Sequence, residues 1–142
     1  MPLTFTNAQE KTRKGLKVNK HTPLVLFVSV PSAPDGIGVV ESSITQYEYK
    51  DILKGIYLIP NSFTTCQLVV RPHPEEDISL HQQFLKIHSN NVIMDSQSSI
   101  LDIINGSDLV ITLHSTVGYE AIILDKPLII LNFNDIISSD CR

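Results

Sequence analysis

The sequence is poor in cysteine and lacks long apolar runs, and each absence excludes a class of protein. Its 142 residues include two cysteines, Cys66 and Cys141, which lie far apart without a CxxC spacing. Neither a disulfide framework nor a zinc site is predicted, and we expect Cys66, beside a predicted strand, to be a small core residue. Aliphatic runs such as residues 24–30 are far shorter than the roughly 20 residues of a membrane span, and no signal peptide opens the chain. We therefore expect a cytoplasmic protein with one globular domain.

Basic residues are concentrated at the start of the chain. The net charge is −4, yet residues 1–21 hold five Lys or Arg against one Glu, which leaves −8 on the remainder. This acidic remainder argues against nucleic acid as a partner. Because the basic start lacks an apolar face, residues 1–22 are interpreted as a basic linker or mobile arm. The alternative is that this arm contacts the anionic inner face of a membrane, which would make the protein a peripheral membrane protein.

From residue 23 onward, strand and helix patterns alternate. Short apolar runs rich in β-branched residues predict five strands, and apolar positions at helical spacing predict helices between them. The strands are expected at residues 24–30, 67–70, 92–94, 109–113 and 128–131; the helices are expected at 42–58, at 80–88, between a Ser98 cap and Gly106, and after Ser115. Residues 23–142 are therefore predicted to form an α/β, Rossmann-like domain with a parallel sheet flanked by helices and right-handed crossovers.

Residues 108–131 form a unit of strand, polar turn, helix and strand, with Ser115 at the position of a helix N-cap. Such a unit brings the positive end of a helix dipole to the carboxyl edge of a parallel sheet, where anions bind. Ser115 and Thr116 would add hydroxyl donors, and Gly118 would let a ligand or a neighbouring chain approach closely. Thr116 and Glu120 share one helical face, so the carboxylate could accept hydrogen bonds from a ribose. The alternative is an ordinary serine cap with a solvated glutamate.

A second candidate site follows the strand at residues 67–70, in the sequence Arg71-Pro72-His73-Pro74-Glu75, which we name the HP turn. Its two prolines stop the strand and stiffen the turn, so the imidazole of His73 is expected to have a fixed direction at the ligand-binding edge. His73 is predicted to donate a hydrogen bond to a phosphate; the alternative is a structural or exposed histidine. Arg71 could pair with a phosphate or with an acidic neighbour, and the acidic neighbour is favoured. His81 and His88 lack a third ligand in register, so they are interpreted as surface residues and no metal site is predicted.

Together, these motifs resemble the C-terminal, donor-binding half of a GT-B glycosyltransferase, most closely that of the bacterial capsule polysaccharide synthesis family. The resemblance spans about residues 23–133 and rests on the HP turn, on DLVIT followed by STVGYEA in residues 108–121, and on Lys126-Pro127. Sialyl- and polyol-phosphate transferases are also similar, through an HP motif and a downstream Ser/Thr motif. The resemblance implies a glycosyltransferase for capsule or another surface polysaccharide. Its substrate would be a nucleotide sugar, CMP- or UDP-linked, with no metal or other cofactor.

The resemblance also implies a role for each candidate residue. His73 would hydrogen-bond the donor phosphate and stabilise the leaving nucleotide, which is the catalytic contribution of this half. Ser115 and Thr116, with the helix start, would hold the same phosphate, Glu120 would bind the ribose, and the turn at residues 94–96 would face the base through its backbone. The predicted substrate-binding set is Arg71, His73, Ser115, Thr116, Gly118 and Glu120.

The sequence departs from this family in two ways. Asp125 stands where many relatives have Gly before Lys-Pro, and Asp tolerates a left-handed helix cap. In addition, no second domain fits in the chain, although the family uses an N-terminal domain to bring the polysaccharide or glycolipid acceptor. We therefore expect a fragment that is inactive without an acceptor domain. Two alternatives stay open: an enzyme similar to UDP-N-acetylglucosamine 2-epimerase, and a non-catalytic nucleotide-binding domain that acts through a partner chain.

Overall fold

A computed structural model of the chain describes residues 7–30, 46–62, 65–88, 91–113 and 116–131. Its centre is a five-stranded sheet in which every neighbouring pair is parallel, in the order β3-β2-β1-β4-β5. The strands are β1 (Leu24–Val28), β2 (Gln67–Arg71), β3 (Val92–Met94), β4 (Leu109–Thr112) and β5 (Leu128–Ile130). This order is that of a Rossmann-like sheet, so the predicted fold class is confirmed.

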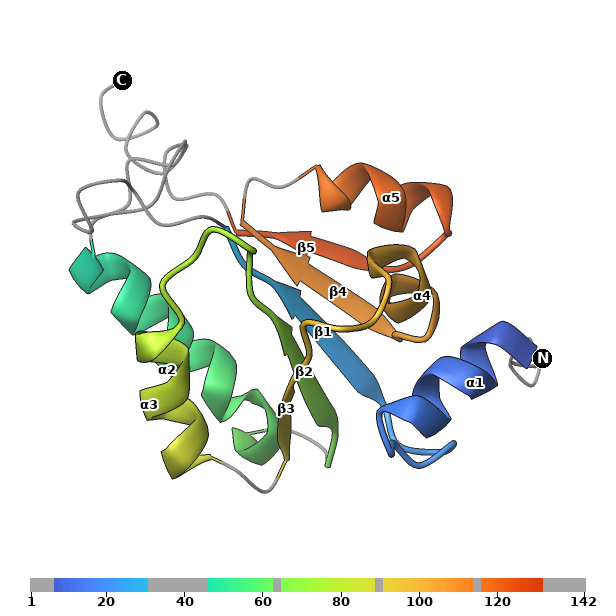
Figure 1. Cartoon of the computed structure of the whole chain (residues 1–142), viewed down its shortest axis with the longest axis horizontal. Coiled ribbons are helices and arrows are strands. Elements are labelled where there is room, and N and C mark those ends of the chain that lie inside the picture. The colour runs from blue at the N-terminus through green and yellow to red at the C-terminus, as the bar shows by residue number, and fades with distance from the viewer. Residues whose placement is uncertain (1–6, 31–45, 63–64, 89–90, 114–115, 132–142) are drawn as a thin grey trace.

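Helices cover both faces of the sheet. They are α1 (Asn7–Gly15), α2 (Gln46–Ser62), α3 (Ser79–Ile87), α4 (Ile100–Asn105) and α5 (Val117–Ile123). α2 and α3 lie on one side, whereas α1, α4 and α5 lie on the other (Figure 1). The central strand β1 is buried at all five positions, which explains why its sequence is a continuous apolar run. Within the described ranges, no helix combines the length and apolar character needed to cross a lipid bilayer.

The side chains of β1 alternate between two cores. Phe27 packs with residues of α2 and α3, whereas Leu26 and Val28 pack with residues of α4 and α5. This alternation follows from the pleat, which sends successive side chains to opposite faces of a strand. Cys66 belongs to the first core, as predicted, and burial raises the pKa of its thiol. Cys141 lies outside the described residues.

Element boundaries differ from the predicted ones mainly at the helices. α2 continues to Ser62, beyond the predicted end at residue 58, with Pro60 in its last turn. Ser99, not Ser98, caps α4, because the side chain of Ser99 accepts the hydrogen bond from the backbone N–H three residues on. Asp125, which follows α5, has a φ of 58°, the left-handed conformation expected for its place before Lys-Pro.

Residues 7–22 are not the mobile linker that the sequence suggested. Leu16 and Val18 are buried in the core beneath α4 and α5. Arg13, in α1, is only 3% exposed, and its guanidinium donates to the backbone carbonyls of Gly106 at 3.0 Å and Asn19 at 2.9 Å. The helix needs no apolar face of its own, because a buried arginine and two apolar residues beyond its end attach it to the domain. The basic segment is therefore part of the folded domain from residue 7.

Both candidate motifs follow strands at the same edge of the sheet. β2 ends at Arg71, within the HP turn, and β4 ends at Thr112, before the turn into α5. β1 lies between these parallel strands, so their carboxyl ends share one edge and are separated by roughly 10 Å, twice the spacing of neighbouring strands. The strand order reverses between β1 and β4, the place where open α/β sheets bind ligands.

Candidate functional site

The HP turn holds His73 in one tautomer. Pro72 is buried and His73 is half-buried, whereas Pro74 and Glu75 are exposed. The Nδ1 atom of His73 accepts a hydrogen bond from the backbone N–H of Glu75 at 3.1 Å. An imidazole nitrogen that accepts carries no proton, so in the neutral ring the proton is on Nε2. His73 therefore presents an N–H donor, the group that the predicted phosphate contact requires.

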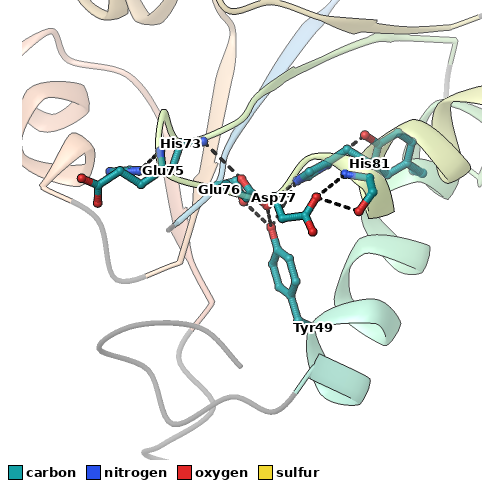
Figure 2. A network of polar contacts seen from close by, with 9 residues as sticks. Tyr49, His73, Glu75, Glu76, Asp77 and His81 are labelled. Carbon is teal, nitrogen blue, oxygen red and sulfur yellow. Dashed lines mark hydrogen bonds and ion pairs between the residues drawn. The ribbon is translucent and has the colours of Figure 1, made fainter. Parts of the chain in front are cut away.

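A buried carboxylate directly after the HP turn attaches it to the helices beneath. Oε1 of Glu76 accepts from the backbone N–H of His73 at 3.2 Å, and the backbone N–H of Glu76 donates to the carbonyl of His73 at 3.0 Å. Oε2 accepts from the hydroxyl of Tyr49 in α2 at 2.5 Å and lies 2.6 Å from Nε2 of His81 in α3. Figure 2 shows Glu76 between His73 on one side and Tyr49 and His81 on the other.

Two further side chains extend this network, which we name the Glu76 cluster: Ser29, Tyr49, Tyr57, Glu76 and His81. The hydroxyl of Tyr57 lies 3.0 Å from Nδ1 of His81, and the hydroxyls of Ser29 and Tyr49 are hydrogen-bonded. Burial, with the nearby Glu76 carboxylate as the second cause, raises the pKa of both tyrosine hydroxyls above its ordinary value. Both tyrosine hydroxyls thus keep their protons, and remain neutral, beside the Glu76 carboxylate.

The prediction that His81 is a surface residue is wrong. Its side chain is fully buried and forms an ion pair or hydrogen bond with Glu76. His88, which was predicted with it, is half-buried, and its ring lies 6.4 Å from the ring of Tyr57. The available signal was the spacing of Tyr49 and Tyr57, eight residues apart on the apolar face of α2, because buried hydroxyls need polar partners.

Arg71 pairs with an acidic neighbour, as the sequence favoured. Its Nη1 atom lies 3.4 Å from Oδ2 of Asp95, in the turn after β3, and also donates to the carbonyl of Ser98. Asp95 in turn accepts from the backbone N–H of Ser98 at 3.2 Å. The guanidinium is therefore used to join the ends of β2 and β3, and this internal pairing competes with the substrate-binding role predicted for Arg71.

The turn after β4 carries the second motif. Ser115 lies outside the described residues, and Thr116 is the N-cap of α5, with φ −60° and ψ −19° and no hydrogen bond from its side chain to the helix. Thr116 is exposed at the carboxyl edge of the sheet. α5 begins one residue later than a Ser115 cap predicts and is seven residues long.

Two buried oxygen atoms beside this turn lack hydrogen-bond partners within the part of the chain that the structure describes. They are Oε2 of Glu120, in α5, and Oγ1 of Thr112, the last residue of β4. Buried polar atoms are satisfied in the great majority of native structures, so each exception calls for an explanation. The sequence predicted Glu120 as a site residue but did not single out Thr112, whose place at the end of an apolar run made it look like an ordinary strand residue.

Gly118 faces the sheet. A Cβ atom added to it would lie 3.4 Å from Leu128 Cδ2, 3.8 Å from Ile130 Cδ1 and 3.9 Å from Thr112 Cγ2. These are ordinary contact distances, so a Cβ here would point at the side chains of β4 and β5, and not at the ligand or neighbouring chain that was predicted. Only its backbone N–H, in the first turn of α5, is left for the predicted contact with substrate.

The carboxyl edge thus combines groups suited to a phosphate ester of a nucleoside. His73 offers an N–H donor and Thr116 a hydroxyl donor, which match phosphate oxygens. Glu120 offers a carboxylate oxygen, which matches the hydroxyls of a ribose. Within the described residues, no group of three or more His, Cys, Asp or Glu side chains could hold a metal ion.

The chain is similar in sequence to one protein family and in fold to several solved structures. A family model described as CDP-glycerol:poly(glycerophosphate) glycerophosphotransferase matches residues 41–136. No curated protein sequence matches the chain. Among solved structures, a variant of the wall teichoic acid polymerase TagF soaked with CDPG gives a TM-score of 0.63 at 18% identity, covering 95% of this chain and 29% of that chain.

Two further structures share the fold. KpsC of Thermosulfurimonas dismutans, a β-Kdo 2,7 transferase, gives a TM-score of 0.55 at 20% identity over 89% of this chain and 42% of that chain. The UDP-GlcNAc 2-epimerase of Neisseria meningitidis bound to UDP-GlcNAc gives 0.62 at 15% identity over 89% of this chain and 32% of that chain. The predicted GT-B resemblance is confirmed at the level of the fold, and the chain spans less than half the length of each structure.

Proposed function

Because the chain belongs to the CDP-glycerol:poly(glycerophosphate) glycerophosphotransferase family, we propose that it is the donor-binding half of a GT-B transferase that builds a surface polymer. The donor is CDP-glycerol or a CMP- or UDP-linked sugar, and the product is a wall, capsule or other surface polysaccharide. The acceptor is brought by a separate acceptor domain, without which the chain transfers little or nothing. The family and the GT-B fold support the reaction class, and the residues at the carboxyl edge support the donor.

The carboxyl edge of the sheet supplies the contacts that such a donor needs. Transfer from CDP-glycerol joins an acceptor hydroxyl oxygen to the phosphorus that carries glycerol, breaks the bond from that phosphorus to the bridging oxygen, and releases CMP. The Nε2–H of His73 and the hydroxyl of Thr116 donate to the phosphate that leaves with CMP, which disperses its growing negative charge. His73 acts in this way as an electrostatic catalyst. The acceptor domain supplies any general base.

The observation that carries this proposal is the buried oxygen of Glu120 without a partner among the described residues, in the first turn of α5, the helix that begins at the same sheet edge as the His73 donor. A ribose hydroxyl donating to this oxygen would satisfy it, whereas an unmatched buried carboxylate oxygen costs about 1–3 kcal/mol or more. The same bound nucleotide would also give the Oγ1 atom of Thr112 a hydrogen-bond partner.

Binding by the full chain tests the proposal. Isothermal titration calorimetry with CDP-glycerol and CMP should detect binding, and His73→Ala and Glu120→Ala should each weaken it by about 1–3 kcal/mol, the value of a lost charge-assisted hydrogen bond. His21→Ala and Asp51→Ala are matched controls, because both side chains are exposed and lie outside the site. The proposal fails if the folded chain binds no cytidine or uridine nucleotide, and the site is wrong if both test variants bind like the controls.

A 2-epimerase-like activity is the second candidate. Its support is the fold shared with the UDP-GlcNAc 2-epimerase, whose TM-score of 0.62 is close to that for TagF. An assay with UDP-GlcNAc separates the two, because a UDP-linked sugar is also a donor that the transferase proposal allows: conversion of UDP-GlcNAc to its C2 epimer favours the epimerase class, and binding without conversion does not. Binding of nucleotide with no transfer, even when a complete acceptor domain is added, favours the non-catalytic alternative.

A further inference from the structure

The Glu76 cluster is buried, polar and unused by the proposed reaction. The side chains of Glu76 and His81 are 1% and 0% exposed, and both lie between the HP turn and the helices α2 and α3. Burying a carboxylate and an imidazole together is unfavourable unless their hydrogen bonds are well formed. A group of this kind directly beneath a predicted site residue requires a reason beyond filling the core.

The hydrogen bonds of the Glu76 cluster all run toward the carboxylate. The Tyr57 hydroxyl has no acceptor within the described residues other than Nδ1 of His81, so it donates there and leaves the imidazole proton on Nε2. Nε2–H then donates to Oε2 of Glu76, which also accepts from Tyr49. Oε1 accepts from the backbone N–H of His73. Three donors from three segments of the chain thus converge on one carboxylate.

These contacts link the cluster to the ring of His73 through the backbone. Glu76 forms two hydrogen bonds with the backbone of His73, one through its side chain at 3.2 Å and one through its own N–H at 3.0 Å. They set the path of residues 73–76, and the backbone N–H of Glu75 on that path holds Nδ1 of His73 at 3.1 Å. The direction and the tautomer of the ring therefore depend on where Glu76 holds the turn.

We propose that Glu76 is a positioning residue for donor binding: anchored by Tyr49 and His81, it holds the HP turn so that Nε2–H of His73 points at the donor phosphate. This inference rests on the proposed function, because it assigns Glu76 to the same site. Glu76 does not touch the donor; it acts through His73. A purely structural role for Glu76 would affect folding stability and would lower binding independently of the residue at position 73.

Glu76→Gln is the sharpest variant, because it keeps the shape of the side chain. The amide has one oxygen and one NH2 group, so it cannot accept at both ends. If its oxygen faces Tyr49 and His81, its NH2 group faces the backbone N–H of His73, and two donors are brought together. The turn then shifts at His73 while the core stays filled. Asp51→Asn is the matched control, since it makes the same carboxylate-to-amide change on an exposed side chain of α2 outside the site.

A double-mutant cycle on the full chain, with calorimetric titration of CDP-glycerol, tests the inference. Glu76→Gln should weaken binding about tenfold, Asp51→Asn should leave it unchanged, and Glu76→Gln should add less than about twofold when His73 is already Ala. Circular dichroism should show the same fold throughout. Equal losses from Glu76→Gln in the wild-type and His73→Ala backgrounds would overturn the inference, as would binding by Glu76→Gln equal to that by Asp51→Asn.

The nitrogen chemical shifts of the His73 ring give a second measurement that needs no ligand. The wild-type chain should show a ring protonated at Nε2, and Glu76→Gln should show a mixture of tautomers; unchanged shifts would overturn the inference. If the wild-type chain binds no cytidine or uridine nucleotide, but the His73 shifts change in Glu76→Gln, the proposed function fails and the anchoring of the turn stands. If Glu76→Gln does not fold, Tyr49→Phe takes its place in both measurements, because it removes one hydrogen-bond donor to Oε2. The same results of the double-mutant cycle and of the His73 shifts then support or overturn the inference.

Discussion

The turns that follow β2 and β4 lie at one edge of the sheet but treat their polar groups in opposite ways. After β2, the carboxylate of Glu76 is fully buried and accepts hydrogen bonds from the backbone of His73, from Tyr49 and from His81. Beside the turn after β4, Oγ1 of Thr112, the last residue of β4, and Oε2 of Glu120 in α5 are buried without partners in the described part of the chain. The Glu76 carboxylate is thus hydrogen-bonded within the protein, whereas the two oxygens of Glu120 and Thr112 can still accept hydrogen bonds from a ligand.

This difference indicates a division of labour at the site. A turn whose polar groups pair internally is rigid and holds a donor in place before a ligand arrives, which lowers the entropy that binding must overcome. A turn with unmatched buried oxygens is less stable by itself and gains most when a ligand supplies donors. We therefore expect mutations in the Glu76 cluster to lower both stability and affinity, and mutations of Glu120 to act mainly on affinity.

The largest effect is expected from Glu76→Ala. It leaves His81, Tyr49 and the backbone N–H of His73 without their acceptor in a buried place, which should lower the free energy of unfolding by about 3–5 kcal/mol. Urea unfolding followed by circular dichroism measures the loss. Glu75→Ala, on an exposed side chain, should change the same quantity by no more than about 0.5 kcal/mol. Similar values for the two variants would mean that the first turn is not held by its carboxylate.

The stability of the chain at alkaline pH should depend on the two tyrosines that lie next to the same turn. Burial raises the pKa of Tyr49 and Tyr57 in the folded chain, so their contribution to stability is present below about pH 10 and is lost as the pH rises above it. Each tyrosine should then lower the free energy of unfolding by up to about 1.4 kcal/mol per pH unit. Urea unfolding between pH 8 and pH 11 should show that the free energy of unfolding falls less steeply with pH for Tyr49→Phe and Tyr57→Phe than for the wild-type chain. Tyr119→Phe, on a tyrosine of α5 that is 72% exposed, should keep the wild-type slope.

The sequence predicted the features that local patterns determine. Continuous apolar runs marked the five strands, because a parallel sheet covered on both faces needs no polar positions. The prolines around His73 marked a stiff turn at the end of β2, and the left-handed conformation of Asp125 agrees with the resemblance, in which many relatives have Gly at that place. In each case the cause lies within a few neighbouring residues.

The errors concern residues whose partners lie in other elements of the structure. Arg13 looked like part of a mobile basic arm because the carbonyl it binds at Gly106 is 93 residues away. His81 looked exposed because its partners come from α2 and from the end of the HP turn. Gly118 looked open to a ligand because the side chains of β5 that fill the space beside it come later in the sequence. Spacing along one element could not reveal these contacts between elements.

The smallest effect on stability is expected from Glu120→Ala, and it sharpens the contrast with Glu76. Removing a carboxylate whose buried oxygen has no partner among the described residues takes away an unfavourable desolvation and breaks no hydrogen bond within that part of the chain. The free energy of unfolding should stay the same or rise by up to about 1 kcal/mol, measured by urea unfolding without nucleotide. The same variant should lose the added stability that CDP-glycerol gives the wild-type chain, because a ligand stabilises a fold only as far as it binds. A loss as large as that of Glu76→Ala would mean that Glu120 is held inside the protein, and the two turns would then not differ.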